Sequence, residues 1–228
     1  MNAGDAEKAV FARIRGASRR SSAEQIAKEL AALKTPAAAP LPTVDLCEAL
    51  RLNLANNGAT SAAVETRSAA VQEISHFITQ KYAQRRVVTG HDPRLAALPW
   101  RDGGLLPRFD IAQNGDTVSV SYAYCAVAES GSLALLLDRN NPGLNNLLVE
   151  DHIILVDRGD IHERIESIWT APRLQEAETR PRGLMMISGP SSTADISMQL
   201  VLGAHGPRAL HVIIVGQEPG QTSGKELL

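Results

Sequence analysis

The feature that most constrains this chain is a series of short, almost uninterrupted apolar runs in its second half. The runs cover residues 117–128, 132–137, 152–156, 183–188 and 210–215. A strand that is apolar at nearly every position can leave neither face to water, so it belongs in a sheet covered on both faces. Helical stretches at 161–169 and 191–202 would supply such a cover. We therefore expect an α/β fold, a three-layer α/β/α sandwich whose sheet is mixed or mostly parallel.

The N-terminal part of the chain predicts a helical arm. Residues 5–17 and 22–33 both have the period of amphipathic helices. Three prolines between residues 34 and 42 then oppose helix and strand alike. We assign residues 1–42 to an arm with a proline-rich linker and residues 43–228 to one α/β domain. The arm can pack on a second subunit or fold back on its own domain, and the sequence leaves both open.

The segment between the linker and the apolar runs predicts smaller elements. Two helices with a short strand near residues 62–64 fit the Ala-rich text of residues 43–84. A short strand at residues 86–89 follows, and the Pro and Gly residues between 93 and 107 indicate loops with a brief helix.

The composition argues against several classes of protein. The chain has 228 residues and a formal net charge of −2, so its general field does not favour nucleic acid or an anionic membrane. No run approaches the roughly 20 apolar residues that cross a bilayer, and the first eight residues lack the apolar core of a secretory signal. We expect a cytoplasmic protein without a membrane span or a nucleic-acid partner.

The cysteines and histidines restrict metal and redox chemistry. Cys47 and Cys125 stand far apart, so this chain alone cannot build an iron-sulfur cluster or a four-cysteine zinc site. We expect both to be reduced and buried, although the sequence alone does not decide against a disulfide between them. The six histidines show no metal-binding spacing such as two His four residues apart on a helix. We expect no metal and no cofactor in this chain.

The sharpest local feature is the junction at residues 188–196, Ser-Gly-Pro-Ser-Ser-Thr-Ala-Asp-Ile. Gly189 permits a tight turn, and Ser191 or Ser192 can cap the expected helix. The free N–H groups of such a helix start bind phosphate or carboxylate, which makes these three residues candidates for ligand binding. Asp195 can occupy those N–H groups itself, or orient a hydroxyl or a neighbouring His. An ordinary capped helix is the alternative.

A second candidate is the loop Gly-Ala-His-Gly-Pro at residues 203–207. Its glycines suit the left-handed end of a helix, and its proline blocks continuation. His205 is then either a stabilised residue beside a helix end or an acid/base or ligand-binding group, with Gly206 beside the ligand.

A third candidate is the turn that follows the first apolar run. Glu129 sits between buried strands, where a tuned carboxylate can act as nucleophile or as general acid/base. Ser130, Gly131 and Ser132 complete the turn and are candidate ligand-binding residues. Glu129 can equally accept backbone N–H bonds and hold the turn.

Taken in order, these motifs resemble those of the LUD-domain family, of the lactate utilization protein C type. Residues 128–133 look like its Ala-Glu-Thr-Gly-Thr-Leu motif and residues 152–156 like its His-Ile strand. Residues 188–196 look like its Ser-Gly-Pro-Ser-x-Thr-x-Asp-Ile motif and residues 203–207 like its Gly-x-His-Gly-Pro. The resemblance is strongest from about residue 120 to residue 215.

The resemblance implies a fold related to the sugar-phosphate isomerase and CoA-transferase group, with the site at the loops that carry these motifs. It also implies a cytoplasmic role in oxidising L-lactate to pyruvate, beside an iron-sulfur subunit and a cysteine-rich subunit that hold the clusters. In the related CoA transferases a Glu beside a Gly-bearing turn attacks the acyl-CoA thioester, and Glu129 resembles that residue.

The chain departs from the family pattern in two places. Ser130 and Ser132 replace threonines, which keeps a hydroxyl at both positions. Residues 139–150 lack the Leu-Pro step that many relatives carry, and Arg139 is their only basic residue. If that loop binds the substrate's carboxylate or a partner, the ligand of this protein differs.

Three functions follow from the sequence. The first is an accessory subunit of a lactate-oxidising iron-sulfur complex, whose pocket at Glu129, the Ser191–Ser192 turn and His205 binds a small carboxylate or phosphorylated ligand. The second is an autonomous acyl-transfer or sugar-phosphate enzyme that uses Glu129. The third is an oligomeric scaffold without catalysis, with the N-terminal helices as its interface.

Overall fold

The computed structural model describes residues 3–17, 22–33, 45–169, 172–176, 178, 180–194 and 200–217. The helices are α1 (Ala3–Ala17), α2 (Ala23–Ala32), α3 (Leu46–Asn56), α4 (Arg67–Lys81), α5 (Pro93–Ala96), η1 (Trp100–Gly103), η2 (Gly143–Asn146), η3 (Arg158–Asp160), α6 (Glu166–Trp169) and α7 (Pro172–Gln175). The strands are β1 (Thr60–Val64), β2 (Arg86–Thr89), β3 (Leu106–Phe109), β4 (Val118–Tyr122), β5 (Cys125–Val127), β6 (Ser132–Leu137), β7 (Asp151–Asp157), β8 (Ile161–His162), β9 (Gly183–Ile187), β10 (Ser192–Ala194), β11 (Leu200–Leu202) and β12 (Ala209–Val215).

The chain divides into two compact units, residues 1–40 and residues 41–228. The first unit contains α1 and α2, as the amphipathic period predicts, and every side chain described in it is exposed. Ser22 caps α2 by accepting the N–H of Gln25 at 3.1 Å. The predicted proline-rich linker, residues 34–42, lies outside the described residues.

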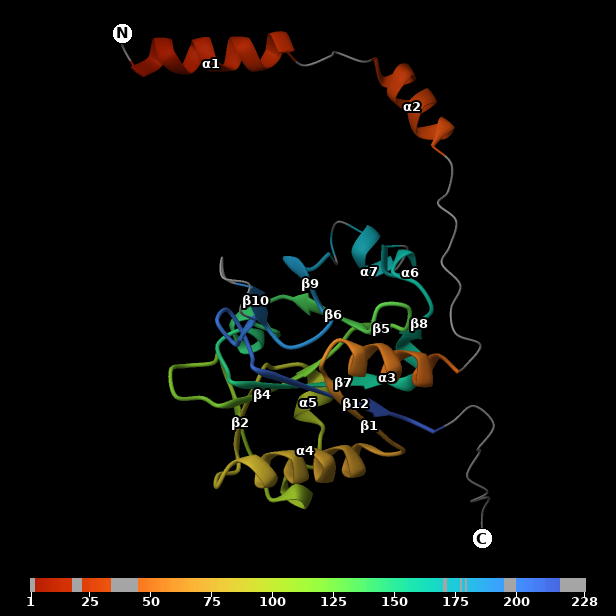
Figure 1. Ribbon diagram of the computed structural model, residues 1–228, viewed down its shortest axis with the longest axis vertical. Coiled ribbons are helices and arrows are strands. Elements are labelled where there is room, and N and C mark those ends of the chain that lie inside the picture. Colours follow the sequence, from red (N-terminus) through yellow and green to blue (C-terminus); the bar gives the residue numbers. More distant parts are fainter. Residues whose placement is uncertain are drawn as a thin grey trace. The chain divides into compact units, whose positions relative to one another are not determined.

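The second unit is built on a six-stranded sheet in the order β1-β12-β7-β4-β2-β3. All of its strand pairs are parallel. Parallel strands need crossover segments on their faces, so both faces of the sheet are covered. Figure 1 shows α4 along one side of this sheet and α3 with a smaller sheet on the other. The predicted layered α/β fold with a mostly parallel sheet is therefore confirmed.

Successive residues of the central strands serve opposite layers because strand side chains alternate. In β7, Ile153 and Leu155 pack with α4, α5 and η1. Ile154 and Val156 pack with α3 and the smaller sheet. All four side chains are fully buried, which is what the uninterrupted apolar run predicts.

The apolar runs form two sheets, whereas the sequence predicts one. The smaller sheet has the order β8-β5-β6-β9 and is antiparallel except for the β5–β8 pair. The run at residues 117–128 crosses between the sheets: the N–H of Ala123 donates to Leu155 O at 2.8 Å, and the N–H of Tyr124 donates to Ala134 O at 2.8 Å. An apolar run indicates that both faces of its strand are buried, but it does not predict which sheet the strand joins.

The predicted helix over residues 191–202 is wrong. β10 and β11 form an antiparallel pair in which Ser192 lies opposite Leu202 and Thr193 lies opposite Val201. The N–H of Gly203 donates to Ser191 O at 2.8 Å and continues the ladder. Both paired residues Thr193 and Val201 are β-branched, which favours strand over helix. The structure therefore has no helix start at Ser191 or Ser192 to bind an anion.

The elements predicted around the sheets are found with two differences. α3, β1, α4, β2 and the brief helix α5 match their predictions, and β3 is an additional strand. The predicted helix over residues 161–169 begins instead as β8, and only Glu166–Trp169 are helical. Among the described residues, no helix has the length and apolar character that crossing a membrane requires.

Candidate functional site

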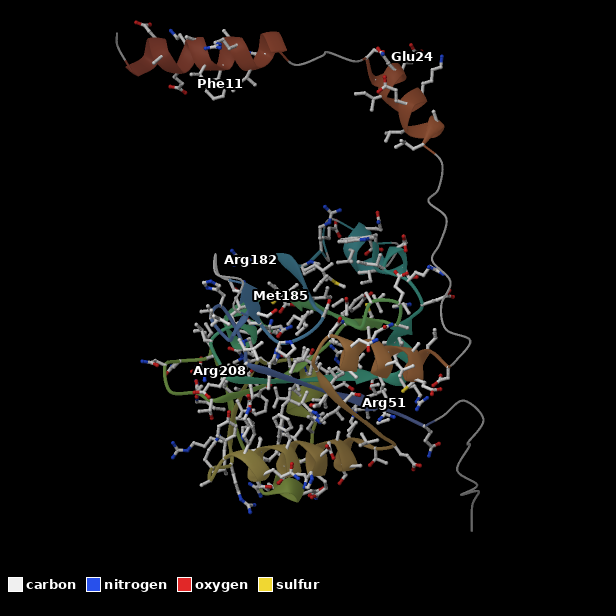
Figure 2. All side chains as sticks on the ribbon, in the orientation of Figure 1. Phe11, Glu24, Arg51, Arg182, Met185 and Arg208 are labelled. Carbon is white, nitrogen blue, oxygen red and sulfur yellow. The ribbon has the colours of Figure 1, made fainter. Side chains whose placement is uncertain are left out.

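A pocket of about 300 Å³ lies between the large sheet, β9 and the loop that leads into β12. Its lining residues come from η2 and the residue after it, the start of β7, β9 and the loop after it, and the approach to β12: Asn146, Leu147, His152, Met185, Met186, Ile187, Ser188, Gly189, Ser191, His205, Gly206, Pro207 and Leu210. Figure 2 marks Met185 on β9 and Arg208, which directly follows the lining residue Pro207. The pocket therefore brings together the motif at residues 188–196 and the motif at residues 203–207.

Tight backbone packing joins these two motifs. The N–H of Ser191 donates to Pro207 O at 2.8 Å. A Cβ at Gly206 would lie 3.1 Å from the Cβ of Ser191, and a Cβ at Gly189 would lie 2.5 Å from Asn57 O. Glycine is therefore required at position 189 for the loop to lie against the end of α3. Four predicted site residues, Gly189, Ser191, His205 and Gly206, line the pocket.

The floor of the pocket is a buried polar chain that starts at His152 of β7. His152 Nε2 lies 2.9 Å from the Oγ of Ser121 on β4. The hydroxyl of Ser121 donates to Asn146 Oδ1 at 2.9 Å, and Asn146 Nδ2 lies 3.8 Å from Met185 Sδ. Ser121, Asn146 and His152 are each 1% exposed. Polar groups buried to this degree are costly unless they are paired, so this chain fixes the floor of the pocket.

His152 keeps one ring nitrogen without a partner. Its Nδ1 is buried and has no hydrogen-bond partner among the described residues. Burial lowers the pKa of this imidazole to about 3, because the charged form would lose its hydration. The ring is therefore neutral at physiological pH.

A row of hydroxyl groups connects the turn after β5 to the pocket. Ser130 Oγ lies 2.8 Å from Ser132 Oγ, and Ser132 Oγ lies 2.6 Å from the Oγ of Ser188. Ser188 lines the pocket. Ser130 and Ser132 thus reach the pocket through Ser188 and do not line it themselves.

Glu129 is engaged away from the pocket. Its Oε2 accepts from Arg164 Nη1 at 3.2 Å, and its Oε1 accepts the N–H of Ile165 at 2.8 Å. The Glu129 side chain is 22% exposed and that of Arg164 is 23% exposed. Both carboxylate oxygens therefore hold the turn after β8, which is the structural role that the sequence left open beside the nucleophilic one.

The turn that Glu129 opens is docked on α3. Asn53 Nδ2 donates to Ala128 O at 2.7 Å, and Asn57 Nδ2 donates to Ser130 O at 2.9 Å. These asparagines are four residues apart and lie on one face of the helix. The Glu-Ser-Gly motif thus positions the smaller sheet against α3, with Gly131 at the contact.

Two further predicted site residues, Ser192 and Asp195, are not among the described residues that line the pocket. Ser192 lies in β10, is exposed and does not line the pocket. Asp195 lies outside the described residues. His152, Ser121, Asn146 and Ser188 were not predicted as site residues, although a polar residue inside an apolar, buried run is itself a signal. That signal was present at residues 119, 121 and 152.

A second hollow of about 470 Å³ adjoins the pocket and shares Leu147, His205 and Gly206 with it. It is lined by Arg208 and Glu150 and by the apolar residues Leu144, Leu148 and Val149, together with Gly203 and Ala204. His205 is exposed at the boundary between the two. A ligand of the pocket can therefore be approached from this side by a basic side chain.

Metal-binding groups do not gather in the part of the chain that the structure describes. No cluster of three or more His, Cys, Asp or Glu side chains is placed there to hold a metal ion. Cys47 and Cys125 are buried and form no disulfide, as predicted. Burial raises the pKa of the Cys125 thiol to about 11, with a smaller contribution from the charge of Asp160.

The sequence is similar to proteins of known families. Residues 109–215 match the family described as LUD domain, and this range contains every residue that lines the pocket. Lactate utilization protein C of Macrococcus caseolyticus is 26% identical over 164 residues, which cover 66% of this chain and 71% of that protein. Lactate utilization protein C of Halalkalibacterium halodurans is 26% identical over 165 residues, with the same coverage of both chains.

One shorter match and one solved structure complete the comparison. An uncharacterized protein of Neisseria meningitidis serogroup B is 34% identical over 95 residues, which cover 42% of this chain and 40% of that protein. The crystal structure of a DUF162 family protein from Deinococcus radiodurans superposes with a TM-score of 0.54 at 20% identity, covering 78% of this chain and all of that one. At this identity the superposition supports the fold alone.

Proposed function

We propose that this chain, whose residues 109–215 match the LUD domain, works in lactate utilization as an accessory subunit of a complex that oxidises L-lactate to pyruvate. The observation that carries the proposal is the pocket over His152. It lies wholly within residues 109–215, the range that matches the LUD domain. Relatives named lactate utilization protein C match about two thirds of the chain.

The lining of the pocket suits a short carboxylic acid. Leu147, Met185 and Leu210 offer apolar contact to a methyl group, while Ser188 and His205 offer hydrogen bonds to oxygen atoms. A volume of about 300 Å³ admits a three-carbon acid together with ordered water, since one water occupies about 30 Å³ in the liquid.

The electrons of lactate oxidation require a second component. Oxidation of lactate to pyruvate releases two electrons and two protons. The two cysteines of this chain are both buried and cannot supply the four thiolates of a cluster. We place the iron-sulfur clusters in partner subunits, one of them cysteine-rich, and give this chain the task of binding the acid.

The two other functions have less support from the geometry. Acyl transfer by Glu129 would need a free carboxylate, and both oxygens of Glu129 are engaged by Arg164 and by the backbone of Ile165. A scaffold without a ligand would not explain why the neutral imidazole of His152 is buried beneath a pocket with one nitrogen unsatisfied.

Calorimetric titration of the purified chain with L-lactate tests the pocket. We expect binding that Ser188→Ala and His205→Ala both weaken. Ser192→Ala is the matched control, because Ser192 is an exposed serine at the start of β10 that does not line the pocket. Equal loss of affinity in the control, or no binding by the unaltered chain, would count against the pocket.

Deletion of the gene in the source organism tests the role. We expect loss of growth on L-lactate and normal growth on pyruvate, with recovery when the gene is restored. Purification of the tagged chain from cells grown on L-lactate should yield partners with the visible absorption of iron-sulfur clusters. Normal growth of the deletion strain on L-lactate would refute the role.

A further inference from the structure

The hollow beside the pocket is lined by Arg208, whose side chain lies along the wall. A Cβ added at Gly203 would stand 2.2 Å from Arg208 Cγ, 3.1 Å from its Cδ and 3.0 Å from its Nε. Gly203 lines the hollow as well. The side chain of Arg208 therefore runs across Gly203, through the space that a larger residue at position 203 would fill. The φ angle of Gly203 is +79°, which favours glycine independently.

The hollow and the pocket meet at His205. This residue lines both spaces, together with Leu147 and Gly206. A ligand oxygen that accepts a hydrogen bond from His205 at the edge of the pocket therefore lies at the edge of the hollow that Arg208 lines. Among the described residues that line the two spaces, Arg208 alone carries a permanent positive charge.

We infer that Arg208 binds the carboxylate of the ligand and makes the site selective for ionised acids over neutral amides of the same shape, an inference that rests on the proposed function. A guanidinium can present two parallel N–H groups to a carboxylate, and it stays charged at physiological pH. The Arg208 side chain is exposed, so it can turn from Gly203 toward an anion without leaving a buried charge unpaired. The carboxylate then faces the hollow, and the rest of the acid occupies the pocket.

The position of Arg208 also answers where the carboxylate finds its positive charge. Arg139 is the only basic residue in the loop at residues 139–150, and it lines neither the pocket nor the hollow. Arg208 directly follows the motif at residues 203–207, so the loop that places His205 places the guanidinium too. Arg208 is thus a specificity-determining residue, and Gly203 is a positioning residue that leaves room for it.

Glu150 opposes Arg208 within the same hollow. The two residues are neighbours at the starts of β7 and β12, where the N–H of Arg208 donates to Glu150 O at 2.6 Å. Both side chains are exposed and both line the hollow. A ligand carboxylate is therefore attracted by Arg208 and repelled by Glu150. Removal of the negative charge of Glu150 should strengthen binding of an acid, an effect that a purely structural role of Arg208 would not produce.

Calorimetry with L-lactate and L-lactamide tests the inference, because the amide has nearly the shape of the acid but no charge. For the unaltered chain we expect L-lactate to bind about tenfold more tightly than L-lactamide, as one charge-assisted hydrogen bond would give. In Arg208→Gln, L-lactate should lose this factor of about ten, whereas L-lactamide should bind as before. Unchanged binding of the amide also shows that the variant keeps the pocket intact.

Three further variants make the test specific to the charge of Arg208. Arg139→Gln removes an exposed arginine that lines neither space, so it should keep the full preference for the acid. Glu150→Gln should raise the affinity for L-lactate about twofold and leave that for L-lactamide unchanged. Arg208→Lys keeps the charge but loses the paired N–H groups, so it should retain only part of the preference.

The outcomes separate this inference from the proposed function. Equal affinity for L-lactate and L-lactamide in the unaltered chain, or a full preference for the acid in Arg208→Gln, would overturn the role of Arg208 and leave the role in lactate utilization standing. Equal losses for acid and amide in Arg208→Gln would overturn it too, since they would mean that Arg208 only supports the fold. Binding of neither compound would overturn the proposed pocket and the inference with it.

Discussion

Gly131 lies against the backbone of Asn53 so closely that a Cβ at this glycine would stand 2.8 Å from the Asn53 carbonyl carbon. The φ angle of Gly131 is +66°, in the left-handed region that side chains with a Cβ rarely adopt. Two independent requirements therefore select glycine at the contact between the smaller sheet and α3.

Gly131→Ala should destabilise the fold by about 3 kcal/mol, which combines left-handed strain with a clash against a helix backbone. Gly115→Ala is the control, because Gly115 has a φ of +99° with open space around its Cβ position. Gly115→Ala should lower the free energy of unfolding only by the cost of the left-handed backbone, about 1 kcal/mol. Urea unfolding of both variants measures the difference, and equal losses would mean that α3 yields to the added methyl group.

Glu129→Ala should lower stability by about 2 kcal/mol and leave the affinity for L-lactate unchanged. The variant removes the acceptor of the Ile165 N–H and one of the two carboxylates that pair with Arg164, the other being Glu163. Glu129→Gln can still accept from Ile165, so its loss should stay below about 1 kcal/mol. Chemical denaturation and calorimetry measure the two quantities. Loss of L-lactate binding in a folded Glu129→Gln would show instead that the carboxylate acts on the ligand.

The large sheet could be predicted because the burial of its strands on both faces is visible in the apolar sequence of each strand. Every residue of Ile153–Val156 is fully buried, so the run is apolar throughout, and burial on both faces follows from the run alone. The hairpin at β10 and β11 could not be predicted in the same way. Its serines favour turns and helix starts alike, and its strands are stabilised by pairing with each other.

The site could be predicted only in part because its chemistry depends on distant partners. Gly189, Ser191, His205 and Gly206 belong to two short motifs, and these motifs do meet at the pocket. The importance of His152 depends on Ser121, 31 residues earlier in the chain. No local sequence pattern predicts such a pairing, and the resemblance to CoA transferases pointed to Glu129 instead.

Cys47 and Cys125 should both resist modification in the folded protein. Each is buried, and burial raises the pKa of Cys125 to about 11, so the reactive thiolate is scarce at neutral pH. Titration with a chromogenic disulfide reagent should release almost no colour from the native chain and two equivalents of thiol in denaturant. Fast reaction of one thiol in the native chain would contradict the burial of that cysteine.

The burial of His152 should make the protein less stable in mild acid. Burial lowers its pKa from 6.5 to about 3, so between these values the unfolded chain binds a proton that the folded chain does not. Above pH 6.5 the titration of His152 leaves the free energy of unfolding unchanged. As the pH falls from 6.5 toward 3, this free energy decreases progressively, and the decrease is about 2 kcal/mol at about pH 5. His211 is buried against Glu73, and its lowered pKa adds to the same trend.

Urea unfolding at about pH 7.5 and about pH 5 measures this effect. Between these two pH values, the free energy of unfolding should decrease less for His152→Gln than for the unaltered chain, by about 2 kcal/mol. His91→Gln, at an exposed histidine, should keep the full decrease. An equal decrease in His152→Gln and the unaltered chain would mean that His152 is protonated in the folded state as readily as in the unfolded one.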